Sequence, residues 1–132
     1  MLRILNKEAK RGEKTKGIFT IQDESGVGMD IPVILINGRN AGPLLWVTAG
    51  IHGAEYAGIE AAIRVARDID PEELSGALII LPVVNTAAYF ERSMYICPID
   101  NKNLNRVFPG DRHGSLTQKL AAICMEEIAP KL

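Results

Sequence analysis

The sequence predicts an α/β fold in which a mixed, partly parallel β-sheet is flanked by helices. Residues 44–49 form a continuous apolar run of strand length, typical of a strand buried on both faces of a sheet. Between residues 59 and 69 the apolar positions recur with helical spacing, and a second apolar run follows over 77–84. Strand, helix and strand in this order predict a right-handed crossover and therefore a parallel pair of strands.

The N-terminal part precedes this crossover. Residues 1–16 are rich in lysine and arginine, and we expect them to form a solvated basic arm ahead of an α/β domain over residues 17–132. Residues 17–22 and 31–36 predict two strands joined by a glycine-containing turn, which favours a hairpin. Pro32 has no N–H to donate, so the second strand either starts there or lies at an edge.

The C-terminal part begins with a long segment of no clear period. Residues 85–114 are polar and contain several asparagines and prolines, but their aromatic residues argue against disorder. A loop of this length in a compact domain is usually functional. Ser115 is then expected to cap a last helix that reaches about residue 129. Its apolar stripe consists of Leu116, Leu120, Ile123 and Ile128.

Composition limits the classes of function. The 132 residues carry a formal charge of −1 and are 47% hydrophobic, as in an ordinary globular domain. Such a charge argues against nucleic-acid or anionic-membrane partners. The two cysteines are too few and too far apart for a disulfide scaffold, and we expect reduced, half-buried thiols. No signal peptide or membrane span is visible, which favours a cytoplasmic protein.

A histidine and a glutamate follow the first apolar strand. His52 and Glu55 are three residues apart at the start of a helix, so both side chains can point at one cation. Imidazole nitrogen and carboxylate oxygen are both good zinc ligands. Two simpler interpretations stay open: His52 as a buried histidine bonded to a backbone carbonyl, and Glu55 as an acid stabilised by the helix dipole.

A second group of polar residues lies in the long loop. Asn105 and Arg106 place an amide donor beside a guanidinium fork, a pair suited to holding a carboxylate. The alternative is ordinary loop chemistry, since asparagine favours turns and arginine often lies along a surface.

Taken together, three segments resemble the succinylglutamate desuccinylase/aspartoacylase family, within the wider zinc carboxypeptidase group. They are residues 44–55 (LLWVTAGIHGAE), 81–85 (LPVVN) and 103–110 (NLNRVFPG), in the family's order. The resemblance implies the N-terminal part of a zinc carboxypeptidase-like (phosphorylase/hydrolase-like) fold. It also implies a zinc-dependent deacylase or amidohydrolase that cleaves an amide or ester bond of an N-acyl amino acid or a similar small carboxylate.

The resemblance also implies roles for individual residues. His52 and Glu55 match the first two protein ligands of Zn²⁺. Asn105 and Arg106 match the pair that grips the substrate carboxylate. Arg92 stands where the family places an arginine that steadies the developing oxyanion, although an ordinary surface arginine is an open alternative. Asp100 and Asn103 are expected only to shape the loop that presents Arg106.

The family's third zinc ligand and its general base have no counterpart in the sequence. His113 lies in a polar turn without a preceding strand, and Glu91, Glu126 and Glu127 match no motif. We therefore expect a truncated zinc hydrolase-like domain that is inactive in isolation, because catalytic zinc sites have three protein ligands. An unpaired sheet edge would favour self-association into a homo-oligomer.

Two alternatives to the deacylase remain. One is a carboxypeptidase-like peptide hydrolase, and the other is a non-catalytic module that binds carboxylates. A P-loop nucleotide site is disfavoured, because Ile59 and Glu60 stand where lysine and serine or threonine are required.

Overall fold

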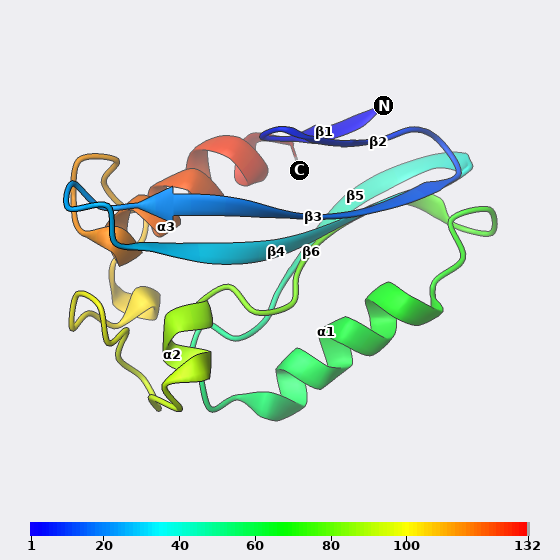
Figure 1. Ribbon diagram of the computed structural model, residues 1–132. Helices are drawn as coiled ribbons and strands as arrows, with labels where there is room; N and C mark the ends of the chain where they lie inside the picture. Colours follow the sequence, from blue (N-terminus) through cyan, green and yellow to red (C-terminus); the bar gives the residue numbers. More distant parts are fainter. Residues whose placement is uncertain (132) are drawn as a thin grey trace.

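A four-stranded mixed sheet organises the computed structural model, which describes residues 1–131 (Figure 1). The strand order is β3-β4-β6-β5, with β3 antiparallel to β4, β4 antiparallel to β6, and β6 parallel to β5. The bounds are β3 Glu13–Gln22, β4 Gly28–Asn37, β5 Asn40–Thr48 and β6 Ser75–Leu81. Helix α1 (Tyr56–Asp68) covers one face of the sheet, and α3 (Leu116–Ile123) packs on the other. The predicted mixed α/β fold is confirmed.

Strands β3 and β4 form the predicted hairpin, with ten residue pairs from Glu13↔Asn37 to Gln22↔Gly28. Asp23 closes the turn, since its Oδ1 accepts the backbone N–H groups of Ser25 and Val27 at 2.9 and 3.0 Å. Pro32 lies within β4 and not at its start, opposite Ile18. It is tolerated because pairing of β4 with β6 begins only at Ile34, so β4 has a single neighbour at Pro32.

The predicted crossover of β5, α1 and β6 is present, and β5 and β6 are parallel. Two details differ from the prediction. Leu45 is 57% exposed, because β5 is the sheet edge in residues 1–131 and is not buried on both faces. Ile63 is also exposed, because α1 faces the sheet through Ala62 and Ala66, and the next residue is turned about 100° around the helix.

The expectation of a solvated arm over residues 1–16 is wrong. Strands β1 (Leu2–Ile4) and β2 (Lys7–Ala9) form a small antiparallel hairpin, and β3 already begins at Glu13. Leu2, Ile4 and Ala9 are buried in the main core. The charged residues conceal a period of two, in which Leu2, Ile4 and Ala9 turn inward while Arg3 and Glu8 turn outward.

The last third of the chain is ordered around short helices: α2 (Thr86–Phe90), η1 (Leu104–Arg106), α3, η2 (Cys124–Ile128) and η3 (Ala129–Lys131). The predicted cap at Ser115 is present and takes the form of a capping box, in which the Ser115 backbone N–H donates to Gln118 Oε1 at 3.0 Å. Both cysteines are free but fully buried, not half-buried as expected. Burial raises the pKa of the Cys124 thiol to about 12, so this thiol stays protonated at neutral pH.

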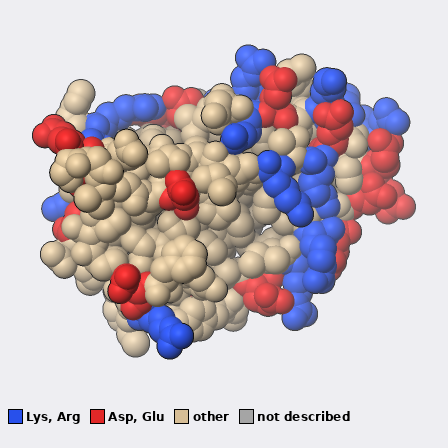
Figure 2. Space-filling view, in the orientation of Figure 1, with Lys and Arg blue, Asp and Glu red and all other residues tan. Residues whose placement is uncertain are grey.

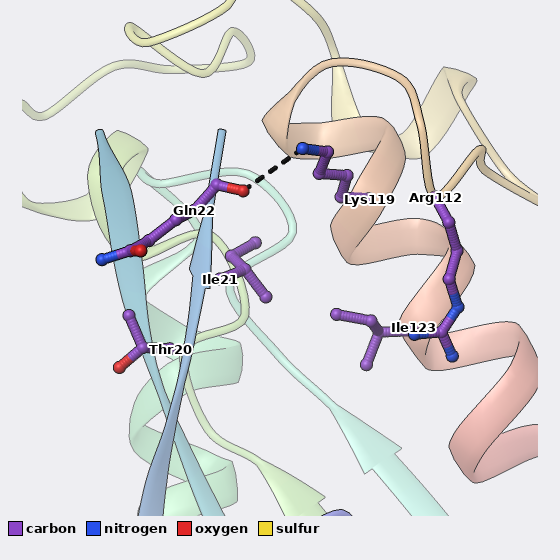
Figure 3. Close-up of a pocket in the computed structure, with 6 residues that line it drawn as sticks. All are labelled: Thr20, Ile21, Gln22, Arg112, Lys119 and Ile123. Atoms are coloured by element: carbon purple, nitrogen blue, oxygen red, sulfur yellow. Dashed lines mark hydrogen bonds between the residues drawn. The ribbon is translucent and has the colours of Figure 1, made fainter. Parts of the chain in front are cut away.

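The surface of the sheet and of α3 offers a small hollow of about 210 Å³, between β3 and α3 (Figure 3). Its polar groups are already engaged: Lys119 Nζ donates to the Gln22 carbonyl at 3.3 Å, and Arg112 pairs with Glu126 and Glu127. Lys119 therefore joins α3 to the end of β3 across this hollow.

Basic and acidic side chains stand beside one another on the face seen in Figure 2. Arg39 and Glu72 form one of the ion pairs of opposite sign in the chain. In residues 1–131 no helix combines the length and the apolar character that crossing a bilayer requires.

Candidate functional site

The backbone that carries His52 leaves the sheet at the carboxyl ends of β5 and β6, where ligands bind in parallel α/β sheets. Pairing continues beyond both strands, since Val84 N–H donates to the Ala49 carbonyl and Asn85 N–H to the Gly50 carbonyl at 2.9 and 3.0 Å. Gly50 adopts φ +67°, a conformation that favours glycine, and turns the chain towards His52.

The loop around His52 is fixed by α2. Asn85 is completely buried; its Oδ1 caps α2 by accepting the Ala88 N–H at 3.2 Å, and its Nδ2 donates to the Ile51 carbonyl at 3.4 Å. Gly53 lies so close to α2 that an added Cβ would overlap the Ala88 carbonyl and stand 2.7 Å from the Ser93 oxygen. The residues on both sides of His52 therefore have little freedom to move.

His52 makes three side-chain contacts. Its Nδ1 lies 2.9 Å from Glu55 Oε1, its Nε2 lies 3.0 Å from Asn103 Oδ1, and its ring packs edge-on against Tyr95 with centroids 5.1 Å apart. The His52 side chain is 14% exposed, whereas that of Glu55 is 58% exposed. The structure thus brings the two predicted metal ligands together. The imidazole of His52 is held by its contact with Asn103, and the carboxylate of Glu55 is open to solvent.

The contact with Asn103 determines which imidazole nitrogen carries a proton. Asn103 Oδ1 also accepts the Asn105 N–H at 3.0 Å, which identifies that atom as the amide oxygen. An oxygen can only accept, so His52 Nε2 donates to it. In neutral His52, Nδ1 then holds a lone pair that faces the carboxylate of Glu55. Two acceptors 2.9 Å apart require a proton or a cation at this position.

These residues fit a zinc ion in type but not in number. One imidazole nitrogen and one carboxylate oxygen converge, and both are usual zinc ligands. Residues 1–131 contain no group of three or more His, Cys, Asp or Glu side chains that could hold a metal ion. His113 is exposed in its loop, where its backbone N–H donates to Asp111 Oδ1. Two of the residues considered as bases, Glu126 and Glu127, pair with Arg112.

The predicted carboxylate clamp lies in the same loop as Asn103. Asn105 and Arg106 belong to η1 and are both exposed. The Arg106 guanidinium bonds only the neighbouring Asn105 carbonyl, at 3.5 Å, and no acidic side chain of residues 1–131 forms an ion pair with it. Its donors are therefore available to a ligand, while Asn103 links this turn to His52.

Arg92 lies after α2, in the left-handed region at φ +54°, and it is exposed. It lines a cavity of about 620 Å³ together with Tyr56, Tyr89 and Phe90. The rings of Tyr56 and Tyr89 meet edge to face, 6.1 Å apart. The sequence does not reveal this aromatic cavity, because its rings lie on two segments without a common spacing. The one signal in the sequence is that Tyr56 directly follows Glu55.

Asp100 supports the loop, as expected. Its Oδ2 accepts the Thr117 N–H and hydroxyl at 2.8 and 2.7 Å, which joins the loop to the start of α3. Partial burial raises the pKa of the Asp100 carboxyl, but hydrogen bonds from Thr117, Ser115 and Lys102 together outweigh it and leave the pKa below its ordinary value of 3.8. Asn103 does more than expected, because it also contacts His52.

We expect Asp100→Ala to destabilise the chain by about 1 kcal/mol at pH 7, because the Thr117 N–H at the helix start loses its acceptor. The folded-state pKa of Asp100 is depressed, so the contribution is present above pH 3.8 and disappears as the pH falls through the folded-state value. Urea denaturation at pH 7 and pH 3 measures this. An equal loss of stability at both pH values would contradict an ionised carboxylate cap.

Comparison with known proteins shows which family this chain resembles. The model of the succinylglutamate desuccinylase/aspartoacylase catalytic domain matches residues 41–132. N-alpha-acetyl-L-2,4-diaminobutyric acid deacetylase of Halomonas elongata is 39% identical over 109 residues, which cover 82% of this chain and 31% of that protein. The chain thus spans about a third of the length of this relative.

Solved structures of two proteins have a similar fold. A succinylglutamate desuccinylase/aspartoacylase from Rhodobacter sphaeroides superposes with a TM-score of 0.86 at 31% identity, covering 98% of this chain and 40% of that one. The product-bound ectoine utilization protein EutE (DoeB) of Ruegeria pomeroyi gives a TM-score of 0.83 at 29% identity, covering 96% and 39%.

The fold and the site therefore define a mixed α/β domain with a His–Glu pair at the carboxyl edge of its parallel strands. The chain belongs to the succinylglutamate desuccinylase/aspartoacylase family.

Proposed function

We propose that this chain forms part of a zinc-dependent amide hydrolase of its relatives' length, acting on an N-acyl amino acid or a similar small carboxylate. The observation that carries the proposal is the convergence of His52 Nδ1 and Glu55 Oε1 at 2.9 Å, while Nε2 is occupied by Asn103. This arrangement leaves one lone pair and one carboxylate directed at the same point, where a cation satisfies both.

In this proposal the candidate site residues have distinct roles. A bound zinc ion would polarise the scissile carbonyl and lower the pKa of a water molecule. His52 and Glu55 hold the ion from one side, and Asn105 and Arg106 bind the substrate carboxylate, because the Arg106 donors have no acidic partner among residues 1–131. Arg92 stabilises negative charge on the carbonyl oxygen if the substrate extends towards the aromatic cavity.

The name of one relative supports a small N-acylated substrate. The Halomonas protein is named for removing the acetyl group from N-alpha-acetyl-L-2,4-diaminobutyric acid. We propose an amino acid with an acylated amine and a free carboxylate as the substrate class of the protein that contains this chain. The aromatic rings of Tyr56, Tyr89 and Phe90 offer apolar surface for the remainder of such a molecule.

The chain by itself supplies two protein donors where a catalytic zinc site requires three. We therefore propose that isolated residues 1–132 bind zinc weakly and hydrolyse amides slowly, and that the family's remaining sequence completes the site.

The test compares this chain with a version extended to the length of its relatives. We expect stoichiometric zinc and amide hydrolysis in the extended protein only, measured by metal analysis and release of free amine. N-acetyl amino acids should be cleaved at least ~100-fold better than their C-terminal amides, because the amide loses the charge that Arg106 binds. Equal cleavage of acid and amide would overturn the carboxylate clamp, and a metal-free active protein would overturn the zinc site.

A further inference from the structure

We propose that residues 94–96 form a wall that receives the acyl group of the substrate and selects acyl groups that are apolar and uncharged. Met94, Tyr95 and Ile96 are consecutive apolar residues, and Tyr95 contacts His52. This role rests on the proposed function, because it concerns the substrate of the same site. It adds the chemistry of the acyl group, which the proposed function leaves open.

The side chains of residues 94–96 are exposed although all three are apolar. Met94, Tyr95 and Ile96 are 58%, 53% and 40% exposed, whereas the next residue, Cys97, is completely buried. None of the three belongs to the hydrophobic cores of residues 1–131, so packing of the described chain does not account for them. Adjacent exposed apolar side chains are typical of a surface that binds an apolar group.

Hydrogen bonds at both ends of this segment hold its side chains outward. The Ser93 hydroxyl donates to the Ile96 carbonyl across the base of the turn. On one side the Ser93 N–H donates to the Ala88 carbonyl of α2, and on the other the Cys97 N–H donates to the Lys102 carbonyl, both at 2.9 Å. The wall is therefore formed before a ligand binds, which lowers the entropic cost of binding.

Two contacts place the wall beside the candidate metal ligands. The ring of Tyr95 stands at 88° to that of His52, with centroids 5.1 Å apart. The Ser93 oxygen lies so close to Gly53 that an added Cβ would stand 2.7 Å from it. A group attached to a carbonyl that reacts at His52 and Glu55 is therefore close to Tyr95.

The acyl group is the part of the substrate that remains for this wall. The carbon of the scissile carbonyl has three substituents. In the proposed function, its oxygen faces Arg92, and its nitrogen leads to the carboxylate that Asn105 and Arg106 bind. The third substituent is the acyl carbon, and residues 94–96 offer it apolar surface.

The chemistry of the wall favours an uncharged acyl group. A thioether, an aromatic ring and a branched alkyl chain gain from covering apolar atoms, and the flexible Met94 can adapt to their shape. Residues 94–96 include no cation. A carboxylate at the end of the acyl chain would lose water against this surface without gaining a partner.

The test uses two substrates of the extended protein, the N-butanoyl and N-succinyl derivatives of one amino acid. Both acyl chains have four carbons, and they differ in a terminal methyl or carboxylate. We expect the wild type to prefer butanoyl by about 100-fold or more in kcat/KM. In Ile96→Lys we expect this ratio to fall at least about tenfold, because the new ammonium group pairs with the succinyl carboxylate.

The matched control is Ile63→Lys. Ile63 is an isoleucine of similar exposure, 43%, on the outward side of α1, so its ratio should equal that of the wild type. A wild type that prefers succinyl would overturn the proposal. So would an unchanged ratio in a folded Ile96→Lys protein, or an equal fall in both variants.

Methyl NMR of the 132-residue chain gives a readout that requires neither metal nor turnover. With ¹³C-methyl methionine, we expect the N-butanoyl amino acid to shift the Met94 signal, assigned with Met94→Leu, more than the N-succinyl one does. Met125, which is 39% exposed, serves as the internal reference. A Met94 signal that responds no more than that of Met125 would contradict the wall. If Met94 responds as expected but the extended protein cleaves no N-acyl amino acid, the proposed function is wrong and the wall is still supported.

Discussion

Glu55→Gln in the extended protein should abolish most of the amide hydrolysis, by about a thousandfold or more, and weaken zinc binding about a hundredfold or more. Among residues 1–131, Glu55 supplies the only carboxylate within hydrogen-bond distance of His52 Nδ1, at 2.9 Å. Glutamine keeps the size of the side chain but replaces the anion by a neutral amide, which is a poor zinc ligand. The measurements are zinc affinity, by competition with a chromogenic chelator, and the rate of amine release.

The matched control is Glu60→Gln. Glu60 lies in α1, the helix that follows Glu55 directly. It is exposed and forms an ion pair with Arg64 at 2.7 Å. Loss of this surface pair should cost less than about 1 kcal/mol and leave zinc binding and hydrolysis unchanged. Full activity in Glu55→Gln would show that Glu55 is not a ligand. Equal losses in both variants would show that the effect is a general one on α1.

Gly53→Ala should destabilise the chain by about 3 kcal/mol and displace His52, because a Cβ at this position overlaps the Ala88 carbonyl. The obstacle is backbone of α2, which cannot turn aside as a flexible side chain would. Relief therefore requires that the loop or α2 shift as a unit. Urea denaturation measures the stability, and the ring contact between His52 and Tyr95, seen by NMR, reports the position of the imidazole.

Gly58→Ala is the control for Gly53→Ala. Gly58 lies in the first turn of α1, and an added Cβ meets no atom within 4 Å. Alanine is the better helix former, so this variant should gain about 0.5–1 kcal/mol. If Gly53→Ala were as stable as the wild type, the packing of the His52 loop against α2 would be looser than the structure shows.

The sequence predicted the fold well where one pattern dominated a segment. The apolar run at 44–49, the helical period after it and the run at 77–84 were enough to predict β5, α1 and β6 with their parallel pairing. The hairpin of β3 and β4 followed from alternation and a turn. Each of these patterns depends only on residues close together in the sequence, so it can be recognised without the rest of the chain.

The predictions for residues 1–16 and for Leu45 were wrong because the burial of these residues depends on distant parts of the chain, which no local pattern reveals. In residues 1–16, Leu2, Ile4 and Ala9 are buried because β1 and β2 lie against the main core, although the lysines and arginines dominate the composition. Leu45 reads as a core residue and is exposed because of the position of β5 in the strand order.

For the site, the sequence predicted that His52 and Glu55 would meet, and their side chains lie 2.9 Å apart. Both residues, however, precede α1 in a turn and do not lie in its first helical turn as expected. The sequence did not predict the contact between His52 Nε2 and Asn103 Oδ1, because Asn103 lies 51 residues further along the chain. That contact depends on how η1 and the long loop pack against the sheet edge. The roles of Asn105, Arg106 and Arg92 remain predictions.

The parallel pairing of β5 with β6 has a consequence for the order of folding. The β3–β4 hairpin closes through a short turn, so its ten pairs can form early and locally. The ends of β5 and β6, in contrast, meet only after α1 has been placed, since the intervening chain must be closed first. His52, Asn85 and Asn103 all converge on those ends. We therefore expect the β3–β4 hairpin to form before the ends of β5 and β6 meet, and thus before His52 and Asn103 come together.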